Sequence, residues 1–145
     1  MNQPAQVPVK KRFPRDLNGL EDLVSFTDQF FRDGSVDSRL RFAVDLCIEE
    51  LFVNMVRYNR ETVHPIQLEL ATCEQGVKIT LTDYDVERFD PRSAPAADVD
   101  APLEQRQPGG LGLFLVMKMV DSIHYEYANR ESKISVVISD GAQHV

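Results

Sequence analysis

Apolar residues recur along the chain with two periods, and the period predicts which segments form helices and which form strands. The first helix is indicated by apolar residues three or four apart, at Leu20, Leu23, Phe26 and Phe30. A longer stripe with the same period predicts a second helix from Asp37 to about Asn59. Asn18 and Glu21 have the spacing of a capping box, so we expect the first helix to begin there.

Strict alternation of apolar and polar residues predicts the strands. A short edge strand is expected between residues 7 and 13, ahead of the first helix. Residues 66–70 and 77–81 alternate on either side of a turn that ends at Gly76, which predicts an antiparallel hairpin with one buried face. Two further strands are expected at residues 123–127 and 134–138. The expected fold class is an α+β two-layer sandwich, with a mixed, mostly antiparallel sheet and helices on one face.

Composition limits the classes of protein that this chain can belong to. It has 145 residues, 43% of them hydrophobic, and a formal net charge of -7, so we expect one domain over residues 1–145. An acidic chain lacks the basic surface that phosphate contacts need, so no direct nucleic-acid partner is expected. No membrane span and no secretory signal are evident, which favours a cytoplasmic protein. Cys47 and Cys73 lie in apolar segments and are expected to be small, buried hydrophobic residues.

A long segment without periodicity separates the two halves of the predicted sheet. Residues 90–108 contain four prolines, and a loop of this length inside a compact domain usually has a function. Gly109, Gly110 and Gly112 follow it and run into a helix predicted at residues 113–120. Glycines let a backbone approach a ligand closely, and a helix N-terminus offers free N–H groups to phosphate. A flexible hinge is an equally good interpretation of this run by itself.

Glu50 and Asn54 are the first candidate chemical group. They are four residues apart on the second predicted helix, so they share one face. Asparagine is unfavourable inside a helix, which suggests that Asn54 has a role beyond the fold. An amide oxygen suits Mg²⁺, and a nearby carboxylate can take the proton of a nucleophile. Taken alone, the pair is better explained as part of a solvated helix edge.

Asp83 is the second candidate. It continues the inward parity of the strand at residues 77–81, so its carboxylate is expected to face the core. A buried carboxylate is costly without a hydrogen-bond donor, and the amino group of adenine would be such a donor. The alternative is that Asp83 caps the turn after the strand.

The order of these features resembles the Bergerat ATP-binding fold, which histidine kinases, gyrase, heat-shock chaperones and mismatch-repair ATPases share. Within that group the chain is similar to the bacterial anti-sigma-factor serine/threonine kinases. The resemblance covers nearly the whole chain and is strongest at residues 45–54, 88–91 and 102–121. It implies the cofactors ATP and Mg²⁺, an anti-sigma antagonist of the STAS type as phosphoacceptor, a sigma factor as second partner, and a homodimer.

The resemblance also implies a role for each candidate residue. Glu50 would be the general base and Asn54 would hold Mg²⁺, while Asp83, or Asp85 beside it, would bind the adenine amino group. Residues from about 84 to 109 would form a lid over ATP. The phosphates would be contacted by the glycine run and by one basic residue, namely Gly109, Gly110, Gly112 and Arg106.

One departure from the family pattern supports a second hypothesis. Asp85 stands where the family has a glycine, two positions after the aspartate. Aligning on Phe89 instead places Val86 at the glycine position and Tyr84 at the aspartate position. Either alignment adds bulk to the site, and the extra carboxylates would repel a triphosphate. The second hypothesis is therefore a nucleotide-free module that sequesters a sigma factor or antagonist stoichiometrically.

A third hypothesis is the ATP-binding half of a split histidine kinase. It is weaker because no helical pair carries a phosphoacceptor histidine. The three histidines fall in a loop, a predicted strand and the tail, at His64, His124 and His144.

Overall fold

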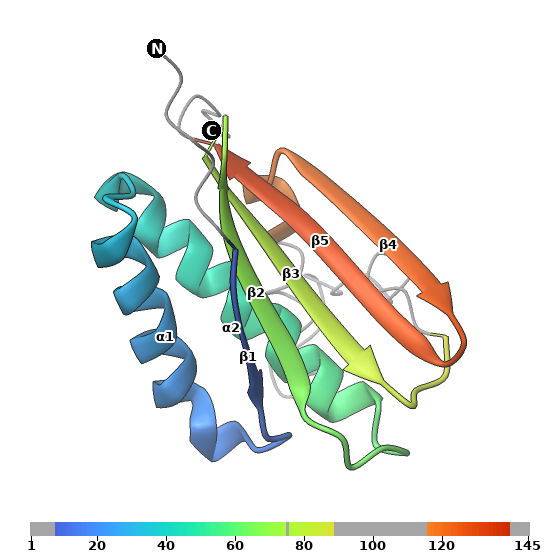
Figure 1. Ribbon diagram of the computed structural model, residues 1–145. Helices are drawn as coiled ribbons and strands as arrows, with labels where there is room; N and C mark the ends of the chain where they lie inside the picture. Colours follow the sequence, from blue (N-terminus) through green and yellow to red (C-terminus); the bar gives the residue numbers. More distant parts are fainter. Residues whose placement is uncertain (1–7, 75, 89–115, 140–145) are drawn as a thin grey trace, which may run out of the picture.

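The computed structural model describes residues 8–74, 76–88 and 116–139 (Figure 1). Within these ranges, five strands form one sheet in the order β1-β2-β3-β5-β4. The strands are β1 (Val9–Phe13), β2 (Ile66–Cys73), β3 (Gly76–Tyr84), β4 (Ser122–Ala128) and β5 (Glu131–Ser139). The helices α1 (Leu20–Asp33) and α2 (Arg41–Tyr58) lie on one face of the sheet (Figure 1). The predicted α+β two-layer sandwich is confirmed, and every neighbouring pair of described strands is antiparallel.

The two helices begin in the same way. Each follows a short 3₁₀ turn, η1 (Leu17–Gly19) or η2 (Ser38–Leu40). Asp16 and Asp37 precede these turns, and each side chain accepts a hydrogen bond of 2.9 Å from the backbone N–H two residues later. The N-cap of α1 is Gly19, and no side chain caps it. The predicted capping box at Asn18 and Glu21 is therefore wrong, because the 3₁₀ turn moves the polar cap back to Asp16.

The hydrophobic core lies between α2 and the central strands. Even-numbered residues of β2 from Ile66 to Leu70 are fully buried, as are alternate residues of β3 and β5. Cys47 on α2 is buried, as predicted. Cys73 is exposed, contrary to the prediction, because it has the opposite parity and ends β2 on the face away from the helices. Within the described ranges, no helix is long and apolar enough to cross a membrane.

Gly76 opens β3 where that strand approaches β5 closely. A Cβ at this position would overlap the carbonyl oxygen of Ile138. We expect Gly76→Ala to lower the free energy of unfolding by about 1–3 kcal/mol, the usual cost of overpacking. Urea denaturation followed by circular dichroism measures this loss. Gly19→Ala is the matched control, because a Cβ there meets nothing within 4 Å. An equal loss in both variants would contradict the expectation.

Candidate functional site

Glu50 and Asn54 lie one turn apart on α2, as predicted. Asn54 is buried, with 4% of its surface exposed, and Glu50 is half-buried. The Nδ2 of Asn54 donates a hydrogen bond of 2.8 Å to the backbone carbonyl of Glu50. That contact fixes the amide one turn after the carboxylate, so the two side chains share one face of α2.

The remaining oxygen of Asn54 is the atom that suits a cation. No donor among the described residues reaches its Oδ1. A buried polar atom without a partner is costly, so this oxygen favours binding a group from outside the chain. Mg²⁺ typically takes one or two protein oxygens together with water and phosphate oxygens. In the described parts of the chain, no cluster of three or more His, Cys, Asp or Glu residues competes for a metal.

The carboxyl group of Glu50 is poised to bind a proton more readily than usual. Burial raises its pKa above the ordinary value, and the neighbouring charge of Glu49 raises the pKa further. Arg57 acts in the opposite direction and lowers this pKa. A raised pKa is what a general base near neutral pH needs. The local electrostatics therefore agree with the predicted chemistry of this residue.

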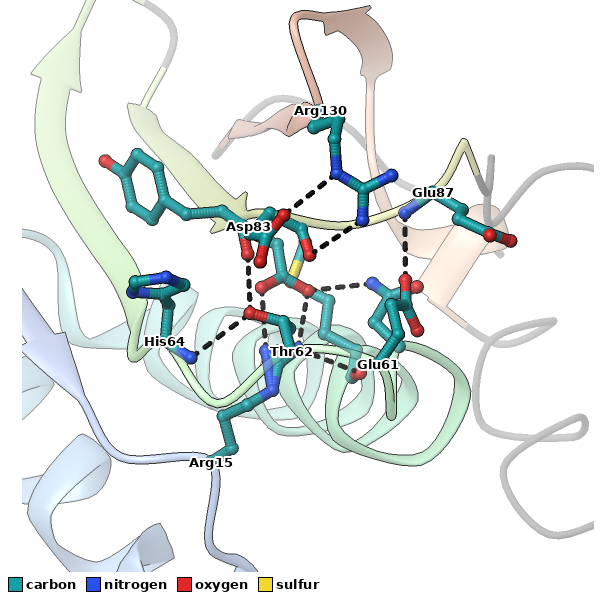
Figure 2. A network of polar contacts seen from close by, with 11 residues as sticks. Arg15, Glu61, Thr62, His64, Asp83, Glu87 and Arg130 are labelled. Atoms are coloured by element: carbon teal, nitrogen blue, oxygen red, sulfur yellow. Dashed lines mark hydrogen bonds and ion pairs between the residues drawn. The ribbon is translucent and has the colours of Figure 1, made fainter.

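Asp83 is the last residue but one of β3, and its side chain is completely buried, as its parity predicted. Figure 2 shows Arg15 reaching it from the segment between β1 and η1. The two terminal nitrogens of Arg15 each donate to a different oxygen of Asp83, both at 2.7 Å. Asn59 at the end of α2 donates a further hydrogen bond of 2.7 Å to Oδ2. Burial raises the pKa of Asp83, and the hydrogen bonds from Asn59 and Arg15 oppose that rise.

Asp85 is exposed and does not face the core. Its φ angle is 58°, in the left-handed region that glycine adopts most easily. This backbone geometry is a physical reason why a glycine would suit the position. The side chain pairs with Arg130 at 2.9 Å, which lowers the pKa of Asp85. Its negative charge is therefore partly neutralised at the surface.

The turn after β3 is held by neighbouring loops from both sides (Figure 2). Thr62 donates a 2.9 Å hydrogen bond to the backbone carbonyl of Tyr84, and Glu61 accepts one of 2.8 Å from the N–H of Glu87. The hydroxyl of Tyr127 donates to the carbonyl of Val86 at 2.8 Å. Both the α2–β2 connection and the β4–β5 hairpin thus fix the chain just beyond Asp83.

The other predicted site residues lie outside the described residues. They are Arg106, Gly109, Gly110 and Gly112, together with residues 89–109 of the predicted lid. Only the last part of the helix predicted after the glycine run is described, and residues 116–119 are helical. Of the predicted site, the described residues therefore include Glu50, Asn54, Asp83 and Asp85.

A separate groove of about 520 Å³ lies between α1 and α2. It is lined by apolar residues such as Leu20, Val24 and Ile48, with Asp45 and Glu49 among its polar residues. Asn54 and Asp83 do not line it. The groove is therefore distinct from the candidate site.

Sequence reasoning missed the residues that surround Asp83. It anticipated that the buried carboxylate needs a donor, but the donors in the structure are Arg15 and Asn59. Arg15 is 68 positions away from Asp83 in the sequence, and no local periodicity links the two. For Asn59, the sequence showed only that a polar residue follows the end of α2, and this did not predict its contact with Asp83.

The fold belongs to a known class of protein. The sequence profile described as the histidine kinase-like ATPase domain matches residues 13–138. This chain belongs to that family.

Two individual proteins narrow the relationship. The serine/threonine-protein kinase BtrW of Bordetella bronchiseptica is 31% identical over 91 residues, which are 61% of this chain and 63% of that protein. This chain thus spans under two thirds of the length of that curated relative. The crystal structure of the RsbU and RsbW domains of Rv1364c from Mycobacterium tuberculosis matches with a TM-score of 0.62 and 13% identity, over 97% of this chain and 35% of that one. That match shows a common fold, and the resemblance to the histidine kinase-like ATPases is confirmed by the family match.

Proposed function

We propose that this protein binds Mg-ATP and phosphorylates a serine or threonine of an anti-sigma antagonist protein, acting in the cytoplasm as a partner-switching regulator of transcription. The observation that carries the proposal is the buried Oδ1 of Asn54 one turn after Glu50, to which no described residue donates a hydrogen bond. Membership of the histidine kinase-like ATPase family supports ATP as the phosphoryl donor. The similarity to a serine/threonine-protein kinase supports a hydroxyl group as the acceptor. A sigma factor as second partner and a homodimer are further parts of the proposal.

The chemistry assigned to α2 is positioning and proton transfer. Asn54 would hold Mg²⁺ through Oδ1, with its amide oriented by the hydrogen bond to the Glu50 carbonyl. The ion would neutralise charge on the phosphates. Glu50 would accept the proton of the serine or threonine hydroxyl. The hydroxyl oxygen would bond to the γ-phosphorus while the bond from that phosphorus to the oxygen of the β-phosphate breaks, leaving ADP. The raised pKa of Glu50 suits that proton transfer.

The charges around Asp83 and Asp85 weaken the expected repulsion of a triphosphate. Asp83 is paired with Arg15, and Asp85 is paired with Arg130. Each carboxylate is thus matched by a guanidinium, so their combined field on a nearby anion is smaller than the sequence suggested. These pairs remove one argument against nucleotide binding.

The proposal is tested by mixing the protein with labelled Mg-ATP and the antagonist-type protein encoded nearest to it. We expect label on a serine or threonine of that protein. Asn54→Ala is expected to abolish Mg-dependent ATP binding, measured by calorimetry, because it removes the oxygen assigned to the cation. Asn18→Ala, at an exposed asparagine, is the matched control and should bind normally. Absence of ATP binding at millimolar nucleotide would contradict the proposal.

A nucleotide-free binding module is the second candidate. It is favoured by the ion pair that Asp83 already makes inside the chain, because this carboxylate has no need of a nucleotide as its partner. Under this hypothesis, capture of the partner in a pull-down is unchanged by ATP and by Glu50→Ala. A yield that collapses under either condition would exclude it.

A further inference from the structure

Both oxygens of the Asp83 carboxylate accept hydrogen bonds from side chains of the chain itself. Arg15 donates to both oxygens, and Asn59 donates to Oδ2. A carboxylate offers about four lone-pair sites, so these three hydrogen bonds use most of its capacity. Because Asp83 is also completely buried, an incoming amino group would have to displace one of these donors to reach the carboxylate.

Arg15 is held in this position by more than the ion pair. Its side chain is 8% exposed, and one terminal nitrogen also donates to the carbonyl of Met55 on α2 at 3.3 Å. A hydrogen bond of 2.8 Å from the N–H of Asp16 to the carbonyl of Pro14 closes the backbone around Arg15. The guanidinium is planar and always charged, and its fork matches a carboxylate in two contacts. The pair of Arg15 and Asp83 is therefore a buried, bidentate ion pair and not an exposed surface pair.

The exchange that base recognition would require is unfavourable. A base amino group would offer Asp83 one neutral N–H, whereas Arg15 offers two charge-assisted hydrogen bonds. Charge-assisted hydrogen bonds are about twice as strong as neutral ones. Displacing the guanidinium would also leave it buried without its counter-charge. The contact of Asp83 with Arg15 is therefore favoured over a contact with a base amino group.

We propose that Arg15 determines base specificity in this protein, by occupying Asp83 and so withholding it from the base of a bound nucleotide. This inference rests on the proposed function, since it concerns how ATP is held. It assigns nucleotide affinity to the phosphate and Mg²⁺ end of the site, with little contribution from the amino group of adenine. It also assigns Asp83 of the wild-type protein to the fold rather than to ligand recognition.

The first test uses the wild-type protein with two nucleotides. Inosine triphosphate carries a carbonyl oxygen in place of the 6-amino group of adenine. We expect calorimetric dissociation constants for Mg-ATP and Mg-ITP that agree within about threefold, because a site that does not bind the amino group cannot select for it. Preference for ATP by about tenfold or more would overturn the proposal.

The second test removes the competitor. In Arg15→Met, Asp83 regains acceptor capacity, so we expect ATP to bind at least about tenfold more tightly than in the wild type while ITP does not. Adding Asp83→Asn should abolish that gain. Arg15→Lys keeps the charge but cannot make the bidentate contact, so it should give a smaller gain in ATP affinity. A folded Arg15→Met protein with no gain for ATP over ITP would overturn the proposal.

The outcomes separate this inference from the proposed function. If the wild-type protein binds both nucleotides equally but transfers no phosphoryl group, the kinase proposal fails and the role of Arg15 stands. If the wild type binds neither, a selective gain for ATP in Arg15→Met or Arg15→Lys still supports the role, and no gain overturns it. Circular dichroism establishes which variants are folded. If Arg15→Met is unfolded, the proposal is decided by the ratio of the wild-type dissociation constants for Mg-ATP and Mg-ITP and by the affinities of Arg15→Lys.

Discussion

Glu50→Gln is expected to lower the rate of phosphoryl transfer to the antagonist about 10²–10⁴-fold, the usual contribution of a general base. Glutamine has nearly the same shape but cannot accept the proton of the attacking hydroxyl. Binding of Mg-ATP should change little, because Asn54 is oriented by the backbone carbonyl of residue 50 and not by its side chain. Single-turnover label transfer measures the rate, and calorimetry measures the binding.

Glu49→Gln is the control for Glu50→Gln, since Glu49 is the exposed acidic neighbour on α2. It should retain transfer activity. Equal loss of rate in both variants, or parallel loss of ATP binding in Glu50→Gln, would show that Glu50 does not act as the base.

The pH dependence of transfer gives an independent test of the same role. A general base works when deprotonated, so the rate should rise with pH through the pKa of Glu50, which burial raises above the ordinary value of a glutamate. Arg57 lowers this pKa and Glu49 raises it. Arg57→Gln should therefore move the acid limb of the kcat/KM profile to higher pH, and Glu49→Gln should move it to lower pH. Shifts in the reverse directions, or none, would exclude Glu50 as the titrating group.

Asp83→Ala is expected to destabilise the fold by about 3–5 kcal/mol, as removal of one partner of a buried ion pair typically does. The guanidinium of Arg15, whose side chain is only 8% exposed, would lose its counter-charge, and the amide of Asn59 would lose its acceptor. Urea denaturation measures the free energy of unfolding. The second variant of a thermodynamic cycle is Arg15→Met, and the double variant should be more stable than the sum of the two single losses implies.

Asp85→Ala is the matched control for Asp83→Ala. It removes an aspartate two positions away whose ion pair with Arg130 is about half exposed. An exposed pair contributes little, so the loss of stability should be much smaller than for Asp83→Ala. Similar losses at both positions would contradict the assignment of Asp83 to a buried structural pair.

Local patterns were sufficient to predict most of the fold. The periods of the apolar residues predicted both helices, the β2–β3 hairpin and the two C-terminal strands, because each is stabilised by burying one face of a regular element. The errors occurred where a single residue or turn decides the outcome. A 3₁₀ turn before α1 moved the polar cap back to Asp16, and Cys73 was placed on the exposed face by its parity.

The candidate site was predictable only in part. Glu50 and Asn54 could be paired from the sequence because four residues in a helix always bring side chains to one face. The burial of Asp83 could be predicted from strand parity, and so could its need for a donor. The identity of the donor to Asp83 could not be predicted, because the candidates included groups from outside the chain.

By itself, then, the sequence determined the two-layer sandwich of helices on a mostly antiparallel sheet and placed an acid and an amide on one face of α2. Tertiary structure alone decided that Asp83 pairs with Arg15 across 68 positions of the chain, and that Asn59 completes the contact. The physical reason is that helix and strand periods follow from neighbouring residues. A buried carboxylate, in contrast, binds whichever donor the packed layers bring to it.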